Sequence, residues 1–338
     1  MRTPRHAAEH LAAAHTAAGR LAIATALGFD PVALPVDDES ARRLGLPPEI
    51  AGAQIVRGRG ALRALLIEAQ TESSLRSLVS RLAVSLTSRT FHVLWLVIGT
   101  ASKGNDVGLA CWSQTDRGPR VVALVARRDH IIASDAETLC ALAATREGDD
   151  LLVFTRWCEL LGREALSRRF YRMLEQRVRG LAESIPGPNG TDRAELALLY
   201  ASRLLFLSFL EAKGWLSGDH AFLAHHFDAC MATGGGFHRN VLLPLFFGTL
   251  NTPFRDRAAK ARQFGSIPFL NGGLFTKSAL ERRYSRACFS DAAFGALFND
   301  LLGAYRFTAR EGQEQWSETA IDPEMLGHAF ESLMAARG

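Results

Sequence analysis

The chain has 338 residues, enough for two domains of ordinary size with a core each. Apolar residues make up 48% and charged residues 22%, which is typical of a folded globular protein and excludes a disordered chain. The net charge of +4 is modest, so charge alone does not predict a nucleic-acid partner, although arginine dominates the basic side and suits phosphate contacts.

No apolar run reaches the ~20 residues that a membrane-spanning helix needs, and the Ala- and His-rich start has no apolar signal core. The five cysteines are scattered without a paired spacing: Cys111, Cys140, Cys158, Cys230 and Cys288. This pattern predicts reduced thiols in a cytoplasmic protein with no membrane partner. It also argues against a zinc centre, and no metal site is predicted.

The first part of the chain, residues 1–148, predicts an α/β domain. Residues 1–28 are rich in alanine and predict one helix, and a Pro-rich stretch with a short helix at 40–44 follows. Apolar residues at helical spacing predict a crossover helix over 72–86. Strand patterns lie before and after it, at 53–56, 61–68, 92–98, 107–113 and 120–125. A sheet of mixed strand direction with an N-terminal helix is therefore expected.

The pattern turns helical at residue 149, and residues 149–338 predict an all-helical domain. Residues 151–184 predict one long helix or two. A Pro- and Gly-rich break at 186–190 precedes the next helix, for which Thr191 or Asp192 is the expected N-cap. Further helices are expected at 220–231, 241–250, 289–302 and 323–336.

Three ordered segments of this helical part are distinctive. Their residues are Arg203-Leu-Leu-Phe-Leu-Ser-Phe-Leu-Glu-Ala-Lys-Gly-Trp-Leu216, Ile267-Pro-Phe-Leu-Asn-Gly-Gly-Leu-Phe275, and 321–333. The last begins a helix with Asp322 as N-cap and Pro323 at the first helical position. Together they resemble the helical region upstream of the methyltransferase core in large bacterial adenine-specific DNA methyltransferases. That family includes type IIG restriction-modification enzymes and the methyltransferases of BREX-like phage-defence systems.

The resemblance implies a helical domain that precedes a missing methyltransferase core, in a truncated chain or a split subunit. In the family a Tyr-Thr-Pro element, the S-adenosylmethionine loop and an Asn-Pro-Pro-Tyr catalytic motif come next, and the sequence contains none of them. The nearest imitation, Asn251-Thr252-Pro253-Phe254, follows no strand and predicts a helix-terminating turn. We therefore expect no cofactor in this chain. S-adenosylmethionine is expected in a core domain or subunit that is its partner.

The resemblance also raises a nuclease alternative, because type IIG enzymes often carry a PD-(D/E)xK nuclease at the N-terminus. Such a site needs carboxylates for Mg²⁺ and a lysine that polarises the attacking water. Glu68 is the acid well placed at a strand end, but Gln70 stands where lysine is expected. An active nuclease, a degenerate nuclease-like fold and an unrelated α/β domain with an exposed Glu68 remain open.

The candidates for contact with double-stranded DNA lie in the first long helical stretch. Arg168, Arg172 and Arg179 recur at spacings of four and seven and so share a helix face; Arg169 lies beside it and Arg163 extends the basic run. Such a face neutralises DNA phosphates with salt-dependent, sequence-blind affinity. A solvated surface or an inter-domain salt-bridge surface is the alternative, and a purely structural, partner-binding subunit is then the third functional hypothesis.

Asn271, Gly272 and Gly273 predict a tight turn, since glycine and asparagine tolerate positive φ. Backbone amides in such a turn can bind a phosphate. The favoured interpretation is a core-anchored turn that fixes the order of the helices.

Overall fold

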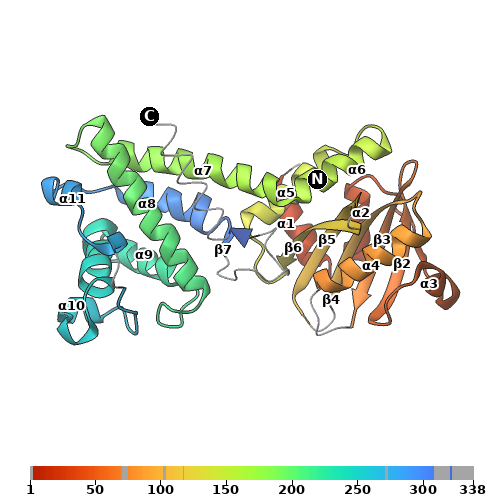
Figure 1. The fold of residues 1–338 in the computed structure, drawn as a ribbon, viewed down its shortest axis with the longest axis horizontal. Coiled ribbons are helices and arrows are strands. Elements are labelled where there is room, and N and C mark those ends of the chain that lie inside the picture. The colour runs from red at the N-terminus through yellow and green to blue at the C-terminus, as the bar shows by residue number, and fades with distance from the viewer. Residues whose placement is uncertain are drawn as a thin grey trace. The chain divides into compact units, whose positions relative to one another are not determined.

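The computed structural model describes residues 3–70, 75–101, 104–116, 118–270, 273–307 and 320–321. These residues belong to two compact units, with a boundary along the chain between Arg168 and Arg169. The first unit contains a mixed β-sheet with its helices, and the second is helical (Figure 1). The predicted fold class, α/β followed by all-α, is confirmed.

The sheet of the α/β unit contains six strands in chain order within the described residues. Their bounds are β1 (Ala33–Pro35), β2 (Ile50–Arg57), β3 (Leu62–Ala69), β4 (Leu94–Ala101), β5 (Asp106–Thr115) and β6 (Gly118–Arg127). Neighbours are antiparallel except β3 and β4, which are parallel. Parallel strands cannot share a tight hairpin, so α4 (Leu75–Arg89) provides the crossover, as predicted. The three-residue edge strand β1 was not predicted; it ends in proline, which an edge strand tolerates.

Alternation along the strands gives the sheet two buried faces. On β3, Leu65 and Ile67 pack with the apolar stripe of α4, including Leu78 and Leu82. Their neighbours on the same strand, among them Leu66, point to the opposite face. There they pack with four helices: α1 (Pro4–Ala13), α2 (Ala17–Ala26), α5 (Ala133–Ala144) and α6 (Asp150–Leu161). Burial on both sides explains why the central strands are almost uniformly apolar.

The prediction of one helix over residues 1–28 is wrong, because the chain breaks between α1 and α2. Thr16 is the N-cap of α2, and its hydroxyl accepts a hydrogen bond from the backbone N–H of Gly19 at 2.9 Å. The turn also brings Gly19 against the end of α1, where a Cβ atom would lie 1.9 Å from the carbonyl oxygen of Ala13. Only glycine fits this approach, so Thr16 and Gly19 together set the break.

The long helical stretch divides at Gly162 into α6 and α7 (Arg163–Ser184). The boundary expected after residue 148 precedes α6, yet α6 buries Val153, Phe154 and Trp157 on the sheet. The short helix predicted at 40–44 is α3 (Asp38–Leu44). Helix α5, which was not predicted, packs on the same face of the sheet as α6.

The helical unit continues with α8, whose N-cap is Asn189 rather than Thr191 or Asp192. The Asn189 side chain accepts from the backbone N–H of Asp192 at 2.8 Å, which places the helix start two residues earlier. The remaining elements are α8 (Gly190–Ala212), α9 (Phe222–Ala232), the π-helical turns η1 (His238–Leu242), η2 (Pro244–Leu250) and η5 (Phe298–Leu302), η3 (Phe254–Asp256), α10 (Ala259–Arg262), η4 (Gly273–Phe275), α11 (Ala279–Arg283), α12 (Asp291–Leu297), β7 (Arg306–Phe307) and β8 (Ala320–Ile321).

Phenylalanine dominates the core of the helical unit. Phe237 is fully buried, and its ring meets those of Phe227, Phe294 and Phe298 at centroid distances of 5.1, 5.4 and 5.6 Å. Edge-to-face contacts of this kind add to the free energy gained by burial. Neither this unit nor the α/β unit has, within the described residues, a helix of the length and apolarity needed to cross a membrane.

Candidate functional site

Helix α7 carries the arginines that the sequence singles out for DNA contact. Its apolar side is buried along Leu166, Phe170, Leu174, Val178 and Leu181. Arg168, Arg172 and Arg179 lie on the other side and are exposed, so the predicted shared face is present. Arg169 is half-buried beside it, and the side chain of Arg163 lies outside the described residues.

Ion pairs reduce the positive field of this helix. Arg179 donates to Glu175 at 3.0 Å, one helical turn away, as the i,i+4 spacing predicts. Arg177, on a neighbouring position, pairs with Asp300 at 3.1 Å. The exposed Arg179–Glu175 pair exchanges readily with solvent ions, since a pair of this kind contributes at most about 1 kcal/mol. A phosphate can therefore compete with Glu175 for Arg179, and Arg172 is exposed for a second contact.

The nuclease candidate Glu68 lies on β3, directly opposite Thr100 of the parallel neighbour β4. A single guanidinium, that of Arg20 on α2, reaches both. It donates to the Thr100 hydroxyl at 2.9 Å and to the Glu68 carboxylate at 3.4 Å. The carbonyl oxygens of Ala14 and His15 also accept from Arg20. Arg20 is buried, and that burial lowers the pKa of its guanidinium while Glu68 raises it.

This geometry is unlike a magnesium site. A nuclease metal needs several carboxylates, whereas the carboxylate of Glu68 faces a cation. Gln70, where the lysine would stand, is exposed, and its backbone N–H donates to the carbonyl oxygen of Glu49 at 2.7 Å. Across the described residues, no three or more His, Cys, Asp or Glu side chains gather in a way that could hold a metal ion. The structure therefore does not support the hypothesis of a nuclease that uses Glu68 as a metal ligand.

In the helical unit, one buried ion pair joins two of the distinctive sequence segments. Arg203 of α8 begins the first segment and has no exposed surface. It donates to the two carboxylate oxygens of Glu281 at 2.6 and 3.1 Å, and to the carbonyl oxygens of Leu274 and Thr276 at 2.7 and 3.1 Å. Leu274 belongs to the second segment. The guanidinium thus fixes the turn at Gly273–Phe275 and the following Thr276 on α8 through charge-assisted bonds.

Aromatic rings enclose this ion pair. The Arg203 guanidinium carbon lies 5.3 to 5.4 Å from the ring centroids of Tyr200, Phe246 and Phe247, within the range of cation–π attraction. Burial opposes ionisation of Glu281, but the hydrogen bonds from Arg203 and from the backbone of Ser278, together with the charge of Arg203, hold the pKa of this carboxyl below its ordinary value. Glu281 also accepts from the backbone N–H of Ser278 and so completes a capping box at the start of α11.

The predicted turn at Asn271, Gly272 and Gly273 is described only from Gly273, since Asn271 and Gly272 lie outside the described residues. Gly273 opens η4, and Phe275 at its end is buried against Phe206 and Phe246. These contacts and the bonds from Arg203 anchor η4 in the core, and the turn at residues 271–273 stays a prediction. Asp322 and Pro323 also lie outside the described residues.

Sequence reasoning missed the partners of Arg203. Arg203 is the single arginine in the apolar stretch of α8 over residues 196–212, and this is itself a signal, because a buried cation requires an anion. Nothing in the sequence says that the anion is Glu281, 78 positions away. The imitation motif at Asn251 is a turn: Asn251 is the C-cap residue of η2, and η3 begins at Phe254.

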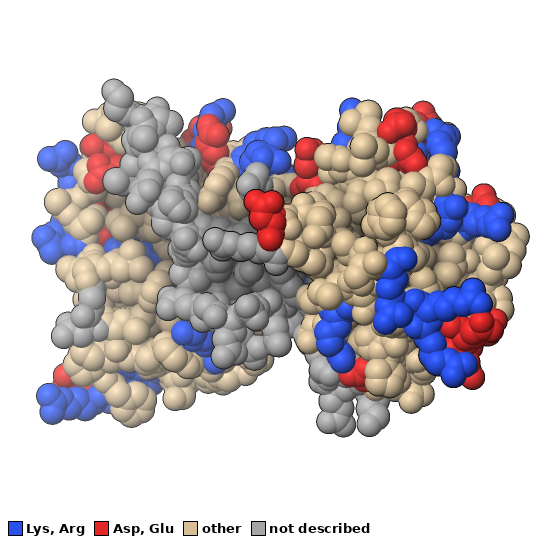
Figure 2. All heavy atoms as spheres, turned by 45° about the vertical axis from the view of Figure 1, so that its right-hand side comes forward, with Lys and Arg blue, Asp and Glu red and all other residues tan. Residues whose placement is uncertain are grey.

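A second group of basic side chains lies on the α/β unit, where Figure 2 shows it with acidic side chains at its border. On α3 and α4, Arg43 pairs with Glu39, and Arg81 pairs with Glu49 at 2.7 Å. Arg89 donates to two carbonyl oxygens at the end of α3. These arginines serve local structure, so this surface is a weaker candidate for DNA than α7.

Comparison with known proteins gives one informative relative. No family model and no solved structure matches the chain. The chain is 31% identical over 159 residues to the protein of Methanocaldococcus jannaschii named "Putative type II restriction enzyme and methyltransferase". The match covers 45% of this chain and 13% of the relative, so the chain spans only a small part of the relative's length. This similarity relates the chain to restriction-modification proteins.

Proposed function

We propose that this chain is a DNA-binding and scaffolding module of an adenine-specific DNA methyltransferase in a bacterial restriction-modification or phage-defence system. The observation that carries the proposal is the 159-residue similarity to a relative whose name joins a restriction enzyme and a methyltransferase. Methyl transfer itself belongs to a core domain or partner subunit that binds S-adenosylmethionine. The present chain positions the DNA for that core.

The exposed face of α7 is the proposed DNA contact. Arg172 and Arg179 neutralise phosphates of double-stranded DNA and release condensed counterions, which gives affinity without sequence preference. Arg179 leaves Glu175 for a phosphate when DNA binds, because the exposed pair contributes little free energy. Sequence recognition is then the task of another part of the methyltransferase.

The scaffolding role rests on the Arg203–Glu281 pair. Fully buried, fourfold hydrogen-bonded and enclosed by rings, Arg203 has one orientation, so the segments that it joins form a fixed frame. A rigid frame positions a neighbouring catalytic core at little cost in conformational entropy. Arginines on a flexible surface would not provide such a rigid frame.

Fluorescence anisotropy with a labelled duplex of mixed sequence tests the DNA contact. Arg172→Ala and Arg179→Ala each weaken binding and lower the slope of log K against log salt by about 0.9, the value for one lost phosphate contact. Glu175→Gln is the matched variant on the same face; it frees Arg179 and strengthens binding. If all three variants bind the duplex with the affinity and the salt slope of the wild type, α7 is excluded as the DNA contact.

A further inference from the structure

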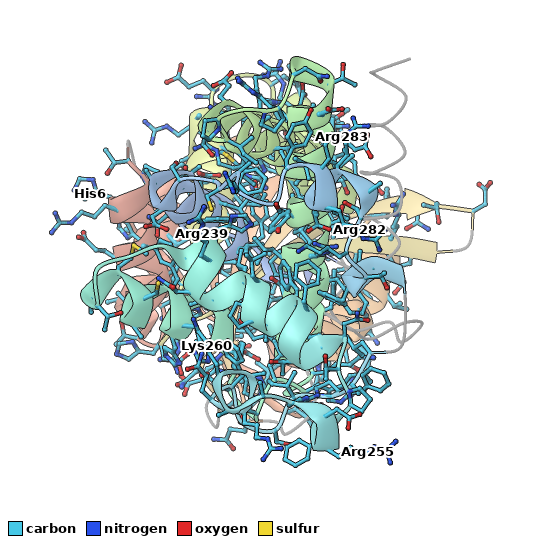
Figure 3. All side chains as sticks on the ribbon, turned by 90° about the vertical axis from the view of Figure 1, so that its left-hand side faces the viewer. His6, Arg239, Arg255, Lys260, Arg282 and Arg283 are labelled. Carbon is cyan, nitrogen blue, oxygen red and sulfur yellow. The ribbon has the colours of Figure 1, made fainter. Side chains whose placement is uncertain are left out.

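A second basic feature of the helical unit lies outside α7 and outside the segments joined by Arg203. Residues 252–262, here called the basic loop, connect η2 to the end of α10. They include four basic side chains and one acid: Arg255, Arg257, Lys260, Arg262 and Asp256. Asp256 interacts with Arg255 at 3.7 Å between exposed groups and neutralises little. Arg255 and Lys260 lie on the face of the unit that is turned toward the viewer in Figure 3.

Arg257 is unlike the other cations of the basic loop. Its exposure is 3%, and its Nε donates to the carbonyl oxygen of Thr252 at 3.0 Å. Both terminal nitrogens, Nη1 and Nη2, are buried, and neither has a hydrogen-bond partner among the residues that the structure describes. Burial lowers the pKa of this guanidinium. A desolvated cation with two unsatisfied donors is costly, so such a group normally has an anion or a water as its partner.

The basic loop holds Arg257 in place before any ligand arrives. Arg262 donates from Nε to the carbonyl oxygen of Arg257 at 2.9 Å. The buried hydroxyl of Thr249 donates to the carbonyl oxygen of Ala261 at 3.0 Å, which ties the end of the loop to η2. The loop backbone is therefore preorganised, and ordering it costs little when a ligand binds.

The ring of Phe254 lies over the guanidinium, with the Arg257 carbon 5.6 Å from the ring centroid. The ring is on the outside of the protein, since Phe254 is 65% exposed. Rotation of an exposed side chain is fast, so the ring can leave the face of the guanidinium. Arg255 and Lys260 then add positive charge at the rim.

We propose that Arg257 is a phosphate-binding residue, with Phe254 as the side chain that moves aside for the ligand. Two parallel N–H donors on one guanidinium match two oxygens of a phosphate group. The same chemistry accepts a free phosphate or a backbone phosphate of DNA. The DNA assignment rests on the function proposed above, and the anion site itself does not.

The test compares Arg257→Met with Arg282→Met. Arg282 is an exposed arginine on α11, and its substitution removes the same charge. With the labelled duplex, Arg257→Met weakens binding about tenfold and lowers the salt slope by about 0.9, while Arg282→Met leaves both near the wild type. Thermal unfolding with and without inorganic phosphate is the second measurement. Phosphate raises the Tm of the wild type and of Arg282→Met, but not of Arg257→Met.

The Tm in phosphate-free buffer is the control for folding. Arg257→Met is expected to unfold at the same temperature as the wild type or higher, because the substitution removes a buried, unpaired charge. If the wild type binds DNA and Arg257→Met changes neither the affinity nor the salt slope, or if Arg257→Met and Arg282→Met change them equally, DNA does not use this site. If wild type binds no DNA, the function proposed above falls. A phosphate effect on Tm that requires Arg257 still supports the anion site, and its absence overturns it.

Discussion

Removing the carboxylate of Glu281 tests the frame of the helical unit. In Glu281→Ala, the Arg203 guanidinium keeps its two carbonyl acceptors but loses its counter-charge inside the protein. Removing one partner of a buried ion pair costs about 3–5 kcal/mol, and loss of the capping box at α11 costs about 1 kcal/mol more. We expect the helical unit to lose about 4–6 kcal/mol, which is roughly a thousandfold or more in its opening equilibrium.

Hydrogen exchange measured by mass spectrometry reports the two units separately. Peptides from α8 exchange much faster in Glu281→Ala, whereas peptides from β3 and β4 in the other unit are unaffected. Ser278→Ala removes only the capping hydroxyl and serves as the matched control, with a loss of about 1 kcal/mol. The reasoning is refuted if Glu281→Ala resembles Ser278→Ala, because the buried charge would then contribute nothing.

Two further outcomes concern pH and the cofactor. Burial lowers the pKa of His238 to about 4, so the unfolded chain takes up the proton first and stability falls as the pH drops from about 6.5 to about 4, by about 3 kcal/mol. Burial raises the pKa of Glu211 to about 7, so stability falls as the pH rises from about 4.5 to about 7. Urea unfolding between about pH 5 and pH 6.5 measures both effects. His238→Phe makes the slope of unfolding free energy against pH more negative, and Glu211→Gln makes it more positive. If both variants keep the wild-type slope, the two pKa assignments are contradicted. Calorimetry of this chain with S-adenosylmethionine is expected to give no binding heat, and tight binding would refute the assignment of methyl transfer to a partner.

Much of the α/β unit was predictable because its signals are local. Alternating or continuous apolar runs mark the five longer strands, and a stripe at helical spacing marks α4 between β3 and β4. The break between α1 and α2 was missed because alanine favours helix on both sides of it. The close approach at Gly19 shows only in three dimensions.

The candidate sites were less predictable. The shared face of Arg168, Arg172 and Arg179 follows from helical spacing, which needs no tertiary information. The partner of Arg203 and the unpaired head of Arg257 depend on which distant segments pack together and on how deeply each guanidinium is buried. Arg257 has three basic neighbours in the sequence, and nothing in that run distinguishes the buried side chain from the exposed ones.

The bonds of Arg20 also set an order of events during synthesis. This residue is synthesised before its acceptors on β3 and β4, which follow 48 and 80 positions later. The first two helices must therefore wait, exposing the apolar residues that α1 and α2 bury on the sheet, until the nascent chain has delivered and paired both strands. A nascent chain halted before residue 100 would therefore leave the apolar faces of residues 4–26 without the strands that cover them.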